Sequence, residues 1–266
     1  MKTVIDLSIP KSWQELPDKE LRYVFRLLNG SFTITQVKAR CLLRWAGMRV
    51  LRQEGALFVI RYKFRAPKAR LGVRASKKQV FAISALQITE AISNLEWLGD
   101  FPVYPVRLSR IGFHRAVRAD LQNVTFEDFL TLDNLYQGYL QTQKEDLLHD
   151  MALILYQANF FGCRLRRRRS IRLTKEEATC IFYWFTSVKR YFASLFTNFF
   201  SSATDGEAFS PSYKQLQDNV NTQIRALTGG DITKEREVLR MDCWRALTEL
   251  DAKAKDYDEL KKVTKS

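Results

Sequence analysis

Apolar residues recur at helical spacing near the start of the chain. The first stripe consists of Leu21, Val24, Phe25 and Leu28. Two helix-start patterns precede it, Ser12 with Glu15 and Leu16-Pro17-Asp18, and Asn29-Gly30 ends it. A second helix is predicted from Thr33, because Thr33 and Gln36 have the spacing of a capping box. Its apolar face consists of Val37, Cys41, Trp45 and Met48.

Three segments of the N-terminal half have the composition of strands or extended chain. Thr3–Ile9 is a short apolar run that ends at Pro10, and Leu57–Phe64 is rich in β-branched and aromatic residues. Residues 101–118 contain two prolines and four arginines and are also expected to be extended.

A helix is predicted between the second and third of these segments. The tetrapeptide Ser76-Lys77-Lys78-Gln79 resembles a capping box, and apolar residues recur at helical spacing after it. The pattern predicts a helix over Gln79–Leu98 with Gly99 as its C-cap.

From Thr125 onward the pattern predicts one helix after another. The first starts at Thr125, the second covers about Lys144–Gln157, and the third is opened by the capping box of Thr174 and Glu177 and continues to about Phe199. Two more are expected, over about Ser212–Leu227 and from Asp231 or Thr233 to Lys262.

These elements predict a predominantly α-helical α+β protein, with a mixed N-terminal part that has a few strands and a helical C-terminal part. Small and polar residues over 201–211 have the composition of a linker. The expected division is a mixed part over 1–122, a helical domain over 123–200, the linker over 201–211 and a C-terminal helical hairpin over 212–266.

The sequence contains no pattern that predicts a catalytic, metal or cofactor site. Its two histidines, His114 and His149, do not have metal-ligand spacing, the four cysteines lie far apart, and no phosphate-binding glycine loop is present. We therefore expect no enzyme activity, no metal and no cofactor. The most hydrophobic window, 178–200, has Lys189 and Arg190 at its centre and is expected to be a buried amphipathic helix without a membrane role.

Two short stretches contain the whole charge excess of the chain. Residues 61–80 include eight Lys or Arg and no acid, residues 164–172 include six and no acid, and together they equal the formal net charge of +14. Such a concentration of charge indicates a polyanionic partner. The candidate binding residues are Arg61, Lys63, Arg65, Lys68, Arg70, Arg74, Arg164, Arg166, Arg167, Arg168, Arg169 and Arg172.

Two kinds of partner fit these residues. Arginine side chains neutralise phosphates, and the nearby Tyr62, Phe64 and Trp45 are residue types that stack on bases, which favours nucleic acid. Arginine also pairs with carboxylates in two-point contacts, which favours an acidic protein surface or an oligomer contact. The pattern favours protein contact, because no recognised DNA- or RNA-binding motif is present.

Four segments of the sequence resemble a poorly characterised family of phage and prophage proteins from Bacteroidota. They are TFEDFLTLDNLYQGYLQTQKEDLLHDMALILYQ, LTKEEATCIFYWFTSVKRYFASLFTNFF, IRALTGGDITKEREVLRMDCWRALTELDAKAKDYDEL and the opening WQELPDKELRYVFRLL. The members of that family lie among virion morphogenesis genes near the tail region. The helix that begins TFEDF and the apolar helix that follows it are also loosely similar to tail-assembly chaperones of long-tailed phages. These are packing motifs, so the resemblance transfers no functional residue.

The resemblance implies a non-catalytic phage morphogenesis protein, in tail assembly or as part of the virion, that acts by protein-protein contact. Its expected partners are other phage structural or assembly proteins, and its expected location is the cytoplasm of the bacterial host or the virion. The alternative is a nucleic-acid-binding protein that uses the basic segments 61–80 and 164–172. The sequence leaves self-association open.

Overall fold

The computed structural model describes residues 9–63, 78–160, 163–164, 171–201 and 213–264. They are mostly helical, with two small antiparallel sheets whose strands lie mostly in the N-terminal half, so the expected fold class is confirmed. The chain divides into two compact units, residues 1–102 and 103–266. The predicted strand Thr3–Ile9, except for Ile9, and the predicted linker after residue 201 lie outside the described residues. The predicted four-part division stays a prediction.

The first helices of unit 1 follow the sequence pattern. A short 3₁₀ helix, η1 (Trp13–Glu15), precedes α1 (Asp18–Leu28), so the start at Pro17 is confirmed and Ser12 makes no capping hydrogen bond. Helix α2 (Ile34–Trp45) begins with the predicted capping box: the Gln36 N–H donates to Thr33 Oγ1 at 3.3 Å, and the Thr33 N–H donates to Gln36 Oε1 at 3.1 Å.

A tryptophan cluster joins the ends of unit 1. The Trp13 ring stacks on Phe25 with centroids 5.8 Å apart and meets Trp97 edge-on at 5.5 Å, and Trp97 stacks on Trp45 at 6.1 Å. Trp13 Nε1 also donates to the backbone carbonyls of Trp97 at 2.9 Å and Asp100 at 3.0 Å. The buried indole therefore combines a large apolar area with a satisfied donor, and it fixes η1 against the end of the unit.

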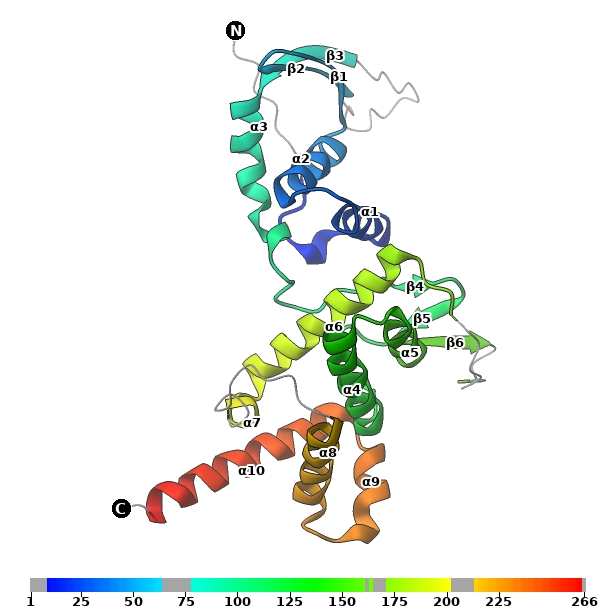
Figure 1. Ribbon diagram of the computed structural model, residues 1–266, viewed down its shortest axis with the longest axis vertical. Helices are drawn as coiled ribbons and strands as arrows, with labels where there is room; N and C mark the ends of the chain where they lie inside the picture. The colour runs from blue at the N-terminus through cyan, green and yellow to red at the C-terminus, as the bar shows by residue number, and fades with distance from the viewer. Residues whose placement is uncertain (1–8, 64–77, 161–162, 165–170, 202–212, 265–266) are drawn as a thin grey trace, which may run out of the picture. The chain divides into compact units, whose positions relative to one another are not determined.

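The first sheet has the antiparallel order β1-β2-β3 (Figure 1), formed by β1 (Met48–Glu54), β2 (Leu57–Lys63) and β3 (Lys78–Ser84). A two-residue turn joins β1 to β2, and Gly55 occupies its first position with φ +59°, where a side chain would be strained. In the register, Ile60 lies between Val50 and Phe81 and is fully buried. The sequence did not predict β1.

The helix predicted over Gln79–Leu98 is wrong in its first part. Residues 78–84 form β3, α3 (Ala85–Ile92) begins after Ser84, and a 3₁₀ segment, η2 (Ser93–Gly99), follows. Phe81 and Ile83 alternate onto the same face as Ile60, so pairing with β2 outweighs the helical spacing of the local sequence. The capping box that starts the helix consists of Ser84 and Gln87.

The second sheet has the order β4-β5-β6-β7 and lies in unit 2. Its strands are β4 (Arg110–Ile111), β5 (His114–Ala116), β6 (Tyr156–Phe160) and β7 (Cys163–Arg164). Helix α5 (Glu145–Leu155) therefore ends two residues before the predicted Gln157, because Tyr156 and Gln157 pair with β5. The Tyr156 hydroxyl donates to the Leu108 carbonyl at 3.1 Å, which holds the start of β6 on the preceding extended segment.

Two further helices, α4 (Phe126–Thr142) and α6 (Lys175–Leu195), carry the aromatic core of unit 2. Thr125 and Thr174 cap them as predicted. In the core, the ring centroids of Tyr136 and Phe185 lie 5.3 Å apart, and the hydroxyl groups of Tyr136 and Thr186 form a hydrogen bond of 3.0 Å. Lys189, at the centre of the most hydrophobic window, forms an ion pair with Asp133 at 2.7 Å. Across the described ranges, no helix combines the length and the apolarity that spanning a membrane requires.

Two of the predicted C-terminal helices are interrupted, whereas the helix predicted over about Ser212–Leu227 is confirmed within one residue at each end. Helix α6 ends at Leu195 and is followed by α7 (Thr197–Ser201), whose Phe199 N–H donates to an Asp251 oxygen at 2.9 Å. The single helix predicted up to Lys262 is wrong, because the chain breaks at Met241-Asp242. The remaining elements are α8 (Tyr213–Thr228), η3 (Ile232–Lys234), α9 (Glu235–Arg240) and α10 (Cys243–Thr264).

The Ser84 cap gives a direct test of where α3 begins. Ser84→Ala removes the acceptor for the Gln87 N–H, which lies 3.2 Å from Ser84 Oγ, so we expect it to lower the free energy of unfolding of unit 1 by about 1 kcal/mol. Ser84→Asp keeps an acceptor at this position and is the matched control. Urea unfolding followed by tryptophan fluorescence measures both variants, and equal stability of Ser84→Ala and the wild type would contradict the assignment.

Candidate polyanion-binding surface

The first predicted basic segment begins and ends in the first sheet. Arg61 and Lys63 lie on β2, and Lys63 pairs with Lys78 of β3 in the backbone register. The sequence-predicted candidates Arg65, Lys68, Arg70 and Arg74 lie outside the described residues. The predicted strand from Leu57 is confirmed as β2, and the predicted loop after it lies outside the described residues. The predicted helix start at 76–79 was wrong, because β3 occupies Lys78 and Gln79.

Arg61 lies on the solvent-facing side of the sheet. In the register it is opposite Arg49 on one side and Val80 on the other, and Val80 is 60% exposed. Alternation along the strands places Ile60 on the other side, where it is fully buried. Arg52, paired with Val59, falls on the same face as Arg61. We call this side of β1-β2-β3, defined by Arg49, Arg52, Arg61 and Val80, the open basic face.

The charges of Arg49 and Arg61 are not neutralised by neighbouring acids. Among the described residues neither forms an ion pair, whereas Arg52 pairs with Glu54. On α2, by contrast, Arg44 is fully engaged, with its guanidinium donating to both oxygens of Glu20 at 2.6 and 3.0 Å. Like charges directly opposite each other on neighbouring strands destabilise a sheet. An anion bound between Arg49 and Arg61 would remove that repulsion.

The second predicted basic segment starts in the other sheet. The backbone of Arg164 belongs to β7, and Arg172 is exposed just before the capping box of α6. Arg166, Arg167, Arg168 and Arg169 lie outside the described residues. The two segments thus begin in different sheets and belong to different units.

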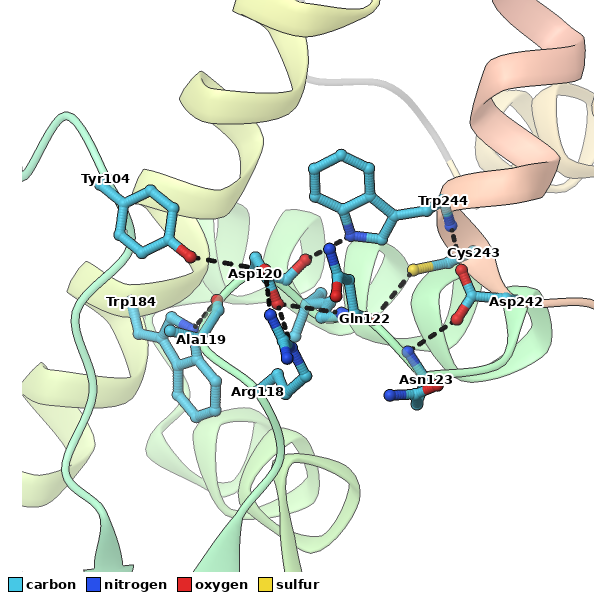
Figure 2. A network of polar contacts seen from close by, with 11 residues as sticks. Tyr104, Arg118, Ala119, Asp120, Gln122, Asn123, Trp184, Asp242, Cys243 and Trp244 are labelled. Carbon is cyan, nitrogen blue, oxygen red and sulfur yellow. Dashed lines mark hydrogen bonds and ion pairs between the residues drawn. The ribbon is translucent and has the colours of Figure 1, made fainter.

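The densest polar network of unit 2 centres on Asp120 (Figure 2). Arg118 donates to both oxygens of this buried carboxylate at 3.2 Å, and the Tyr104 hydroxyl donates to one of them at 3.4 Å. Burial raises the pKa of the Asp120 carboxyl, but the hydrogen bonds from Arg118 and from the Gln122 N–H outweigh burial and hold the pKa below its ordinary value. Asp120 is therefore ionised and fully engaged.

The same network attaches the backbone of residues 119–124 to two helices. Trp184 Nε1 of α6 donates to the Ala119 carbonyl at 2.7 Å, and Trp244 Nε1 of α10 donates to the Asp120 carbonyl at 2.6 Å. Asp242 accepts from the Asn123 N–H at 2.6 Å and from the Trp244 N–H at 2.9 Å (Figure 2). Most of these bonds join a side chain to a backbone group of residues 119–124, so the network holds this loop in place.

The buried thiols do not add a nucleophile. Cys243 lies in this network with Sγ 3.3 Å from the Leu121 carbonyl, and burial raises the pKa of its thiol far above the ordinary value. Burial likewise raises the pKa of Cys41 in unit 1 to about 12. Both thiols therefore stay protonated near neutral pH, and the thiolate is the reactive form. In the described part of the chain, no three metal-ligating side chains come together.

Sequence reasoning missed Arg49 and Arg52 because they lie outside the acid-free stretch. One signal was available: Gly55 between Glu54 and the predicted strand from Leu57 is a hairpin pattern, and regular pairing outward from it places Arg52 opposite Val59. Arg49 lies opposite Arg61 only because the register shifts between Val50 and Arg52, which the sequence does not indicate. The exposed residues of the second sheet, Arg110, Phe113 and Arg115, were also missed, since residues 101–118 were predicted only as extended.

The low pKa of Asp120 predicts acid sensitivity of unit 2. A carboxyl whose folded pKa lies below its unfolded value stabilises the fold fully above about pH 5, and this stabilisation is lost as the pH falls through the folded pKa. Asp120→Asn should lower the free energy of unfolding at pH 7 and flatten its decline below about pH 4. Urea unfolding between about pH 3 and pH 7 measures the free energy of unfolding, and Asp258→Asn, at an exposed position, is the control. An unchanged pH profile in Asp120→Asn would contradict the role of the carboxylate.

Comparisons of the chain with protein-family models, curated proteins and solved structures found no match. The resemblance to phage proteins therefore stays an expectation from the sequence. The function has to be argued from the surfaces of this chain itself. One of them, the open basic face, contains the sequence-predicted candidate Arg61.

Proposed function

We propose that this protein is a non-catalytic phage morphogenesis protein that binds another phage structural or assembly protein through an acidic surface of that partner. The observation that carries the proposal is the open basic face, where Arg49 and Arg61 lie opposite each other on neighbouring strands without an ion pair among the described residues. The resemblance of the helical segments supplies the phage setting, with tail assembly or the virion as the place of action.

The apolar residues of the open basic face favour protein over nucleic acid as its partner. Val80 on the edge strand β3 lies directly opposite Arg61 and is 60% exposed, and Leu57 on β2 is 44% exposed. A protein partner can bury such aliphatic side chains while its carboxylates pair with the guanidinium groups in two-point contacts. Phosphates alone would leave the aliphatic side chains in water. The combination of flat apolar surface and arginine therefore fits an acidic protein surface better.

The edges of this sheet add a second reason for protein contact. The strand order places β1 at one edge and β3 at the other, and six of the seven β1 residues are exposed. Edge strands expose backbone N–H and C=O groups with which an extended segment of another chain can pair. A partner that lies on the open basic face can thus also hydrogen-bond to the β1 edge.

The proposal is tested by reversing the charge of the open basic face. We expect Arg49→Glu with Arg61→Glu to reduce capture of a phage protein from infected or induced cells by about tenfold or more, because carboxylates would then face carboxylates. Lys11→Glu with Lys19→Glu changes the net charge by the same amount at exposed positions of the same unit and is the matched control. Capture is measured by affinity purification and mass spectrometry.

The outcomes distinguish binding of a phage protein from binding of nucleic acid. Equal capture by the Arg49/Arg61 variant and the wild type, or recovery of host ribosomal proteins alone, would count against the proposal. Loss of the captured material on nuclease treatment would assign the open basic face to nucleic acid. In that case oligonucleotide affinity should fall steeply with salt, since bound phosphates release counterions.

A further inference from the structure

A second basic surface lies on the hairpin of β4 and β5 in unit 2, outside both sequence-predicted segments. The strands are joined by Gly112-Phe113, and Gly112 has φ +55° at the first turn position, as in the turn of the first sheet. Figure 1 shows β4, β5 and β6 side by side next to α5. The hairpin is anchored by Ile111, which is 2% exposed. Its backbone is therefore fixed although the turn projects into solvent.

Phe113 at this turn is 96% exposed. A phenylalanine ring in water lacks the stabilisation that burial would provide, and the neighbouring buried Ile111 shows that the hairpin has a buried side. The ring thus stands outside the core on a rigid two-residue turn. Its planar face is open to a ligand, and little conformational entropy is lost when a ligand stacks on it.

Basic residues flank the ring. Arg110 and Arg115 lie directly opposite each other in the register, both are exposed, and alternation puts them on the side of the sheet away from Ile111. Arg115 forms no ion pair among the described residues. Position 115 is two residues from Phe113, about 7 Å along an extended strand, which is a short enough distance for one bound nucleotide chain to contact both.

The register also connects this hairpin to β7 through β6. Arg115 pairs with Gln157 of β6, and Asn159, two positions further along β6, pairs with Arg164 of β7 in the backbone register. Alternation therefore places positions 110, 115 and 164 on one face. The fold thus places Arg110 and Arg115 in one sheet with residue 164, which lies 49 to 54 positions further along the chain.

We propose that this hairpin binds single-stranded nucleic acid, with a base stacked on Phe113 and phosphates contacted by Arg110 and Arg115. An exposed aromatic ring beside guanidinium groups is the arrangement with which proteins bind single strands independently of sequence, because every base has a stacking face and every phosphate a charge. A duplex offers no free base to the ring. The proposal goes beyond the proposed function, since it concerns another unit, another sheet and another class of partner.

The experiment measures fluorescence anisotropy of a labelled single-stranded oligonucleotide, as DNA and as RNA, and of the duplex of the same sequence. The full chain is titrated in at salt concentrations from about 50 to 200 mM. Phe113→Leu keeps an apolar side chain but removes the ring, and we expect it to weaken single-strand affinity about tenfold. Phe113→Trp keeps a stacking ring and should retain or improve affinity.

Arg115→Gln tests the phosphate contact. It should reduce the slope of log affinity against log salt by about 0.7, the value for one phosphate of a single strand. Two controls change the same unit away from the hairpin: Val103→Ala removes another exposed apolar side chain, and Arg236→Gln removes another exposed arginine charge. Circular dichroism of all variants checks that the fold is kept, which the exposure of the altered side chains leads us to expect.

Each outcome decides the proposal. Ring-dependent single-strand binding with a reduced salt slope in Arg115→Gln supports it. Absence of binding by the wild type, tighter binding of the duplex, or equal affinity of Phe113→Leu and the wild type would overturn it. Binding to anionic phospholipid vesicles that Phe113→Leu retains and Phe113→Ala loses would assign the hairpin to a lipid surface. Failure here leaves partner capture by the Arg49/Arg61 face unaffected, so the two proposals fail separately.

Discussion

The structure of unit 2 depends on one constraint, the attachment of the loop 119–124 to two helices by side-chain donors. Two residues of this loop, Leu121 and Asn123, have left-handed φ values of +59° and +65°, which side chains disfavour and which surrounding contacts must hold. The indole N–H groups of Trp184 and Trp244 donate to consecutive carbonyls, and the Cys243 N–H donates to the Val124 carbonyl at 2.9 Å. Because Asp242 and Cys243 bind the loop, α10 has to begin there, and the chain cannot continue the helix from α9. The Phe126 N–H then donates to the Met241 carbonyl at 2.8 Å, which fixes the start of α4 beside the start of α10.

Both units use the same device, a buried indole that supplies apolar area and one strong donor. In unit 1 the Trp13 indole donates to the Trp97 and Asp100 carbonyls at the end of η2. In unit 2 the Trp184 and Trp244 indoles donate to carbonyls of the irregular loop 119–124. A buried carbonyl without a hydrogen bond costs free energy, so each tryptophan stabilises the one backbone conformation that brings these carbonyls to its indole N–H. Two polar groups of the interior are engaged in the same region: Asp120 is held by Arg118 and Tyr104, and Cys243 is protonated against a carbonyl. The binding candidates among the described residues are therefore two surfaces, the open basic face and the hairpin of β4 and β5.

Those surfaces share a construction. In each sheet a two-residue turn with glycine at its first position closes a hairpin, and the solvent side of the hairpin has two arginines directly opposite each other, Arg49 with Arg61 and Arg110 with Arg115. For Arg49 and Arg61, which form no ion pair among the described residues, the repulsion reduces folding stability and is relieved by a bound anion. The two faces differ in their apolar residues. Aliphatic side chains spread over the first face fit a protein surface, whereas a single exposed ring at the tip of the second fits a base.

The sequence by itself determined the features that depend on neighbours three or four residues apart. The capping boxes at Thr33 and Thr174 and the start of α4 at Thr125 were predicted because donor and acceptor lie within one helical turn. The sequence also located the basic segments, since charge can be counted. Only the tertiary structure decided that residues 78–84 form a strand, that the last helix breaks at Met241-Asp242, and that Arg49, Arg110, Phe113 and Arg115 are binding candidates. Each of these depends on hydrogen bonds or register with residues distant in the chain, such as Phe81 with Ile60 or Asp242 with Asn123, and such pairing outweighs local spacing because it buries a face or satisfies a backbone group.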